Sequence, residues 1–136
     1  MKKTKTIVVV DDDASLCLLM KHILGANHCV VTFTNGMEAL AWLSEGNKAD
    51  LIVTDIVMSG ISGTELLMNL KSSGIFKEIP VIVVSSYPEL EKKEESLKLG
   101  AAFYLSKPFN PEILKEIVFK IAYQKLNDSQ KISSYA

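Results

Sequence analysis

The sequence predicts an α/β fold of the (βα)5 type, in which a doubly wound sheet of five parallel strands is covered by helices on both faces. Two observations predict this fold. Short runs rich in Val, Ile and Leu alternate five times with helical patterns along the chain. Most of these runs are continuously apolar instead of alternating with polar residues, which is typical of strands buried on both faces. Connections between such units are right-handed crossovers, so we expect the strands to be parallel.

The predicted strands are rich in β-branched residues, which favour extended structure. They cover residues 7–10, 29–33, 51–54, 81–84 and 102–105. A helical pattern follows each strand in turn, with apolar residues at helical spacing. The predicted helices cover residues 15–24, 37–43, 63–71, 88–99 and 111–126.

The residues between these segments are typical of helix boundaries. Gly25 and Gly100 directly follow the first and fourth helices, where glycine is a common C-terminal stop. An Asn-Gly turn precedes the second helix, and Ser62 suits the N-cap of the third. Asn110 and Pro111 supply an N-cap and a first-turn proline for the last helix.

The composition indicates a single globular domain. The chain has 136 residues, of which 48% are hydrophobic and 23% are charged, both ordinary for a globular protein. Its net charge of −1 predicts no broad basic face and therefore no nucleic-acid contact. We expect one domain at residues 1–126 and a polar tail at residues 127–136.

The start of the chain is basic, but the apolar stretch behind it ends at Asp11, which is too short for export or for crossing a membrane. Cys17 and Cys29 lack metal-site spacing and lie among apolar residues. We therefore expect reduced, buried thiols in a cytoplasmic protein without membrane contact.

Polar side chains follow four of the five predicted strands. In chain order they are Asp11, Asp12 and Asp13, then Asp55, then Ser85 and Ser86, and finally Ser106 and Lys107. Ligands of open parallel sheets bind outside the carboxyl ends of the strands. Carboxylates suit a divalent cation, while a hydroxyl and an ammonium suit phosphoryl oxygens. The sequence therefore predicts a site for a cation and a phosphoryl group at this edge.

Single members of this set also suit simpler roles. Asp13 suits a helix N-cap, Ser85 an ordinary polar strand end, and Lys107 a solvated loop. Asp55 suits none of these, because it follows an apolar strand and precedes the apolar segment 56–58. The occurrence of all four groups at strand ends favours the site.

The chain resembles the receiver domain of two-component response regulators, and chemotaxis-regulator-like receivers in particular. The resemblance covers about Lys5 to Leu126. The matching motifs are Asp11 and Asp12, the segment 50–58 around Asp55, Ser85, Tyr104, and Lys107, Pro108 and Phe109. The resemblance implies a flavodoxin-like fold with strand order 2-1-3-4-5. It also implies a cis bond between Lys107 and Pro108.

By this resemblance, Asp55 accepts a phosphoryl group from the phosphohistidine of a histidine kinase or a phosphotransfer protein. The implied cofactor is Mg²⁺. Asp12 and Asp55 would hold it directly, Asp11 through water, and Val57 through its backbone carbonyl. In this arrangement the site would position the reacting groups and neutralise the charge that spreads over the phosphoryl group during transfer.

The resemblance further implies a switch. Lys107 and Ser85 would contact the phosphoryl oxygens, Ser85 would be drawn toward them, and Tyr104 would turn inward. This would repack the face of the fourth helix, fifth strand and fifth helix. That face would serve an unknown downstream effector or a phosphorylation-dependent homodimer. Such a receiver is not an enzyme, because it assists only its own phosphorylation and dephosphorylation.

Several positions depart from the family pattern. Ser59 stands where proline usually follows the loop methionine, which loosens the loop but removes no functional group. Ser86 replaces a very small residue and would narrow access to the site. Val57 and Tyr87 occupy positions that tune hydrolysis of the acyl phosphate in the family. Because they are apolar and aromatic, they should exclude the attacking water, and we expect a long-lived phosphorylated state.

The first predicted helix offers a docking hypothesis. Its core stripe is expected to comprise Leu16, Leu19, Met20 and Ile23. Cys17 and Leu18 would then lie on the outer side and could receive the kinase's phosphohistidine domain. The alternative is a slightly apolar helix flank without a function, because scattered exposed apolar residues are normal.

An alternative function is a haloacid-dehalogenase-like phosphatase, with Asp11 as nucleophile and Asp13 as general acid/base. This alternative leaves Asp55 unexplained. It also requires an acidic pair on a strand after Lys107, where the sequence offers only Asp128. A receiver-like scaffold that is never phosphorylated is a further alternative, and the complete set of acids, hydroxyl and lysine argues against it.

Overall fold

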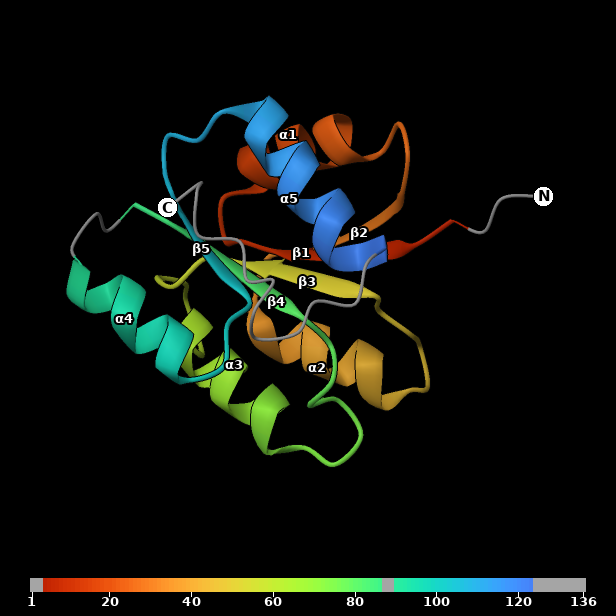
Figure 1. Cartoon of the computed structure of the whole chain (residues 1–136). Coiled ribbons are helices and arrows are strands. Elements are labelled where there is room, and N and C mark those ends of the chain that lie inside the picture. The colour runs from red at the N-terminus through yellow and green to blue at the C-terminus, as the bar shows by residue number, and fades with distance from the viewer. Residues whose placement is uncertain (1–3, 87–89, 124–136) are drawn as a thin grey trace.

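The computed structural model describes residues 4–86 and 90–123. Its five parallel strands form one sheet in the order β2-β1-β3-β4-β5 (Figure 1). The strands are β1 (Thr6–Val10), β2 (Cys29–Phe33), β3 (Leu51–Thr54), β4 (Val81–Ser85) and β5 (Phe103–Ser106). The predicted α/β fold and its strand order are confirmed.

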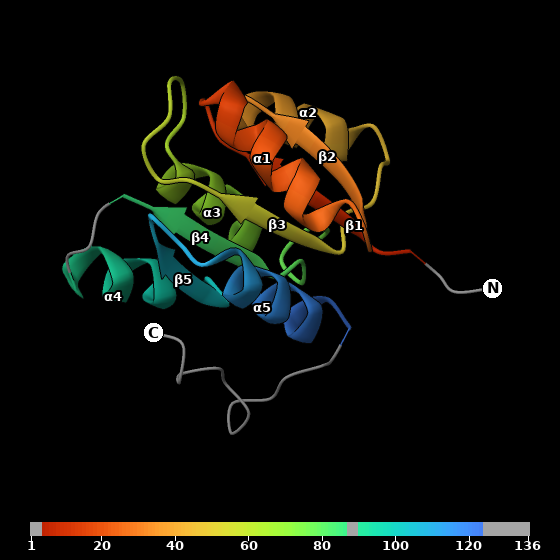
Figure 2. The same cartoon turned by 90° about the horizontal axis from the view of Figure 1, so that it is seen from above.

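Helices cover both faces of the sheet. They are α1 (Ala14–Leu24), α2 (Gly36–Ser44), α3 (Gly63–Ser72), α4 (Leu90–Lys98) and α5 (Pro111–Tyr123). Helices α1 and α5 lie on one face, and α2, α3 and α4 lie on the other (Figure 1). Seen from above, α1 and α5 lie in front of the sheet (Figure 2). Parts of the predicted last two helices, residues 88–89 and 124–126, and the predicted tail 127–136 lie outside the described residues.

The two faces of the sheet bury two separate cores, because successive residues of a strand point to opposite faces. In β1, Ile7 and Val9 pack with α1 and α5, whereas Val8 and Val10 pack with α2 and α3. The central strand β3 is buried along its whole length. The sheet is therefore a rigid support for the residues that follow its strands.

Three of the predicted helix boundaries, at Gly25, Ser62 and Gly100, are confirmed. Ser62 and Glu65 form a capping box at the start of α3, with each side chain accepting from the backbone amide of the other residue. Gly25 is the C-cap of α1. Gly100 follows α4 with a φ of +108°, a conformation that favours glycine.

The two cysteines differ in their surroundings. Cys17 is buried, whereas Cys29 opens the edge strand β2 and is exposed. The prediction of a buried thiol is therefore wrong for Cys29, because the start of an outermost strand is not covered as a central strand is. None of the helices in the described part of the chain has both the length and the apolar character that a membrane span requires.

Candidate functional site

The polar groups at the strand ends surround one shallow cleft at the carboxyl edge of the sheet. The cleft is lined by Asp11, Asp12, Asp13, Asp55, Val57, Ser85, Ser86 and Lys107. The parallel order of β1, β3, β4 and β5 places their carboxyl ends at this edge. Residues nearly 100 positions apart in the chain therefore come into contact, as between Lys107 and Asp11.

Asp55 is a buried carboxylate in the lining of the cleft. Its backbone amide donates to the carbonyl of Val10 at 3.1 Å, which extends the sheet pairing beyond β3. Its Oδ1 accepts the amide of Ile56 at 2.7 Å, and its Oδ2 accepts Nζ of Lys107 at 3.0 Å. Both carboxylate oxygens are thus oriented by neighbouring groups.

Lys107 links the two buried carboxylates of the site. Its Nζ donates to Oδ2 of Asp11 and to Oδ2 of Asp55, each at 3.0 Å. Its amide donates to the carbonyl of Ser85 at 2.7 Å, and a cis peptide bond joins it to Pro108, as expected. Burial disfavours the ammonium, but the two carboxylates outweigh burial and raise the pKa of Lys107. The side chain therefore stays a cation.

Asp11 is buried and carries an electrostatic cost. Burial raises its pKa, while the Asp13 amide and Lys107 oppose that rise and the charge of Asp55 adds to it. A second positive charge would relieve this cost.

Three carboxylates form a cluster suited to a hard cation. Asp11, Asp12 and Asp55 each offer one oxygen atom, and these atoms lie within 4.8 Å of one another. Lys107 supplies one positive charge against these three negative charges. Mg²⁺ prefers oxygen ligands of this type. The donor set therefore fits the cation that the sequence implied.

The three consecutive aspartates have three different positions. Asp11 is buried, Asp12 is exposed at the cleft, and Asp13 caps α1 by accepting from the amides of Ser15 at 2.9 Å and Leu16 at 3.3 Å. The N-cap alternative for Asp13 is confirmed. Its side chain is engaged with the helix, although the residue also borders the cleft.

A backbone donor at the site was not expected from the sequence. The amide of Ser59, in the loop between β3 and α3, donates to Oδ2 of Asp12 at 3.2 Å. The sequence suggested only that Ser59 loosens this loop. Proline has no N–H. The presence of serine where the family usually has proline was therefore the sequence signal for an additional backbone donor in this loop.

The residues expected to form the switch are both buried. Ser85 ends β4 inside the cleft, and Tyr104 lies in β5 opposite Val83 of β4. Tyr104 packs in the core shared with α2 and α3. The structure thus has the aromatic side chain in the inward position.

Of the two residues that were expected on the outer side of α1, Leu18 is exposed and Cys17 is not. Leu18 is 70% exposed and Leu19 is 47% exposed, whereas Cys17 is only 4% exposed. Cys17 donates its thiol to the carbonyl of Asp11 at 3.2 Å. Helix α1 begins at Ala14, and its steps of about 100° per residue turn Cys17 to the core and Leu19 outward. The outer side is an apolar hollow lined by Ser15, Leu18, Leu19, Lys21 and His22.

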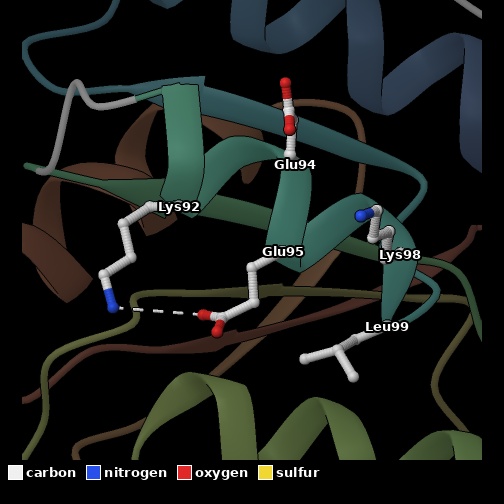
Figure 3. Close-up of a pocket in the computed structure, with 5 residues that line it drawn as sticks. All are labelled: Lys92, Glu94, Glu95, Lys98 and Leu99. Carbon is white, nitrogen blue, oxygen red and sulfur yellow. Dashed lines mark ion pairs between the residues drawn. The ribbon is translucent and has the colours of Figure 1, made fainter.

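A second cleft lies along α4 but lacks convergent chemistry. It is lined by Lys92, Glu94, Glu95, Lys98 and Leu99 (Figure 3). Lys92 and Glu95 form an exposed ion pair at 4.0 Å, while Glu94 points away from that pair. Exposed pairs of this kind contribute little stability.

Comparison with known proteins agrees with this geometry. The family model described as the response regulator receiver domain matches residues 7–119. The chain is 32% identical to chemotaxis protein CheY-3 of Vibrio cholerae, over 89% of this chain and 94% of that protein. It is also 32% identical to histidine kinase P4 of Formosa agariphila, over 98% of this chain but only 10% of the kinase.

A solved structure shows the same fold. The phosphorylated cyanobacterial phytochrome response regulator RcpA superposes with a TM-score of 0.81 at 28% identity, covering 91% of this chain and 98% of RcpA. These matches leave the dehalogenase-like alternative without support. The chain belongs to the response regulator receiver domain family of two-component signalling.

Proposed function

We propose that the chain is a phosphoacceptor in which Asp55 receives a phosphoryl group from the phosphohistidine of a histidine kinase or a phosphotransfer protein. The observation that supports this most is the position of Asp55. Its carboxylate is buried and forms an ion pair with Lys107. It also belongs to the carboxylate cluster that Asp11 and Asp12 complete. RcpA, a structural relative, was solved in phosphorylated form.

In the proposed transfer, a carboxylate oxygen of Asp55 forms a bond to phosphorus while the phosphorus–nitrogen bond of the donor breaks. The electron pair of that bond returns to the imidazole nitrogen. Lys107 Nζ shifts from its two carboxylates toward the phosphoryl oxygens, and the Ser85 hydroxyl donates to one of them. The protein thus contributes mainly positioning and charge compensation.

Mg²⁺ is the cofactor that we propose for this site. Asp12 and Asp55 would bind it directly, Asp11 would bind it through water, and Val57 would offer its backbone carbonyl. When bound, Mg²⁺ neutralises charge that develops on the transferring group. The fit of three carboxylate oxygens within 4.8 Å supports this assignment.

The proposed output is the face formed by α4, β5 and α5. Contact of Ser85 with the phosphoryl group would favour one packing of Tyr104 and of this face. A downstream effector or a second copy of the chain would bind the favoured packing. We place this activity in the cytoplasm, as signalling without turnover of an external substrate.

The phosphorylated state is proposed to be long-lived. Val57 is apolar and borders the cleft, while Tyr87 lies outside the described residues. A Val57→Asn variant should hold water near the acyl phosphate and lose the phosphoryl group faster. Equal or slower loss, measured by intact mass over time, contradicts this part of the proposal.

The central experiment is incubation with Mg²⁺ and acetyl phosphate, followed by intact mass measurement. We expect a single phosphoryl adduct in the wild type and none in Asp55→Asn. Turnover of acetyl phosphate that survives in Asp55→Asn but disappears in Asp11→Asn would instead support a phosphatase. An adduct that persists in Asp55→Asn would place the acceptor elsewhere.

A further inference from the structure

The Ser59 amide reaches across the cleft to the end of another strand. It donates to Oδ2 of Asp12 at 3.2 Å, and the two residues are 47 positions apart. Asp12 is the exposed member of the carboxylate cluster, whereas Asp11 and Asp55 are buried and bonded to Lys107. An exposed aspartate side chain can turn into solvent unless something holds it.

The loop around Ser59 is fixed on both sides. Met58 is buried in the core shared with α2 and α3. Gly60 has a φ of +81°, and Ile61 beyond it lies against Gly36 at the start of α2. The Ser59 amide is thus a donor whose position is set by its neighbours rather than by its own side chain.

We propose that the backbone N–H of Ser59 is a positioning group that aims the Asp12 carboxylate at the cation site. A hydrogen bond to an ionised carboxylate is charge-assisted and directional. It restricts Asp12 while leaving the other carboxylate oxygen and a lone pair for a metal ion. Proline, which the family resemblance predicts at this position, has no N–H and cannot supply this bond. This inference rests on the proposed binding of Mg²⁺ at the cleft.

The first test compares Ser59→Pro with Ser59→Ala, because only the alanine variant keeps the amide. Mg²⁺ affinity is measured by calorimetric titration of the folded, unphosphorylated protein. We expect Ser59→Pro to bind Mg²⁺ about threefold to tenfold more weakly, as for loss of one hydrogen bond. We expect Ser59→Ala to bind within about twofold of the wild type, since its amide is retained.

A second test uses no proline and no metal. In Asp12→Ala, the exchange of the Ser59 amide proton with water is followed by NMR at fixed pH. Loss of the acceptor should speed this exchange about threefold to tenfold, while the Ser73 amide, bonded to Leu70 at 3.2 Å, should keep its rate. This measurement remains decisive even if Ser59→Pro does not fold.

The outcomes separate this inference from the proposed function. Equal Mg²⁺ affinity in the wild type and Ser59→Pro, or unchanged Ser59 exchange in Asp12→Ala, overturns the positioning role alone. Absence of Mg²⁺ binding in the wild type overturns both the metal site and the positioning role. Weaker binding by Ser59→Ala than by Ser59→Pro would assign the effect to the hydroxyl and overturn the role of the amide.

Discussion

The position of Asp55 is fixed, because its amide, its carbonyl and its carboxylate each form hydrogen bonds with a different neighbour. Its amide donates to Val10, and its carbonyl accepts the hydroxyl of Thr54 at 2.9 Å. The same carbonyl lies against Gly63, where a Cβ atom would overlap the oxygen, and the Gly63 amide donates to the carbonyl of Ile56 at 2.7 Å. The first residue of α3 must therefore lack a side chain if Asp55 is to keep its place.

Replacing Gly63 with alanine should displace Asp55. Because the added methyl group meets backbone atoms that cannot rotate away, we expect a loss of about 1–3 kcal/mol in stability. Phosphorylation by acetyl phosphate should also become slower. Thermal unfolding and intact mass measure the two effects. Gly74→Ala is the matched control, since a Cβ atom there meets nothing within 4 Å. If Gly63→Ala unfolds and is phosphorylated like the wild type, the start of α3 can move to make room for the methyl group, and the prediction is wrong.

At the residue level, the sequence predicted the positions of side chains better than the contacts of backbone groups. Asp13 was recognisable as an N-cap, because capping depends on local chain chemistry. Asp55 stood out because no local role explained it. The Ser59 amide could not be predicted, because every residue except proline carries such a donor. Its partner depends on the path of the loop in space.

Among the elements, the strands were predictable and one helix face was not. The β-branched runs place each strand within about one residue of its observed position. In α1, residues 16–20 are all apolar, so the apolar stripe has no clear edge. The predicted stripe put Leu19 inside and Cys17 outside, and the structure has the reverse. The N-cap at Asp13 was the better guide to the helix phase.

The outer face of α1 supports a docking prediction. Leu18→Glu should slow phosphoryl transfer from a histidine kinase that phosphorylates the wild type, because a charge replaces apolar contact area. Phosphorylation by acetyl phosphate, which needs no docking surface, should continue. Ile75→Glu is the control, since Ile75 is 82% exposed on the segment before β4. Rates of both reactions in both variants provide the measurement. Unchanged transfer from the kinase to Leu18→Glu removes the docking role.

For the whole molecule, we predict that the proposed cation site at the acidic cleft makes stability depend on Mg²⁺. At a concentration ten times its Kd, Mg²⁺ should add about 1.4 kcal/mol to the free energy of unfolding. Thermal unfolding with and without Mg²⁺ measures this gain as a rise in Tm. Asp12→Ala should remove most of the rise, because it removes a proposed direct ligand.

Asp13→Ala provides the matched control for that experiment. Loss of the N-cap should lower stability by about 1 kcal/mol with or without Mg²⁺. The rise in Tm caused by Mg²⁺ should nevertheless persist. If Asp12→Ala keeps the rise and Asp13→Ala loses it, Asp13 is the ligand in place of Asp12.

A buried histidine should make the stability of the whole fold depend on pH. His28, after α1, lies with Nδ1 3.2 Å from the Tyr123 hydroxyl at the end of α5, and burial lowers its pKa from 6.5. The unfolded chain therefore binds the proton first as the pH falls. Stability is full above about pH 6.5 and declines as the pH falls from there toward the lowered pKa of the folded state.

Urea unfolding at pH 7.5, 6.5 and 5.5 measures this decline. His28→Asn should flatten it, because asparagine does not titrate in this range. His22→Asn is the control, since His22 is exposed on α1, and it should retain the wild-type decline. A decline that His28→Asn leaves intact would assign the pH dependence to another group.

Because Cys17 is buried and Cys29 is exposed, Cys29 is the cysteine that a thiol-reactive reagent can reach. Burial raises the pKa of the Cys17 thiol, with the charge of Asp11 adding to the rise, so Cys17 is a poor nucleophile. Cys29 is exposed at the start of β2, paired with Thr6 at the start of β1. It lies about 13 Å along the strand from the end that faces the cleft. A maleimide dye would therefore attach at the amino end of β2, opposite the end of the sheet that carries the cleft. There it could report on partner binding without touching the aspartates.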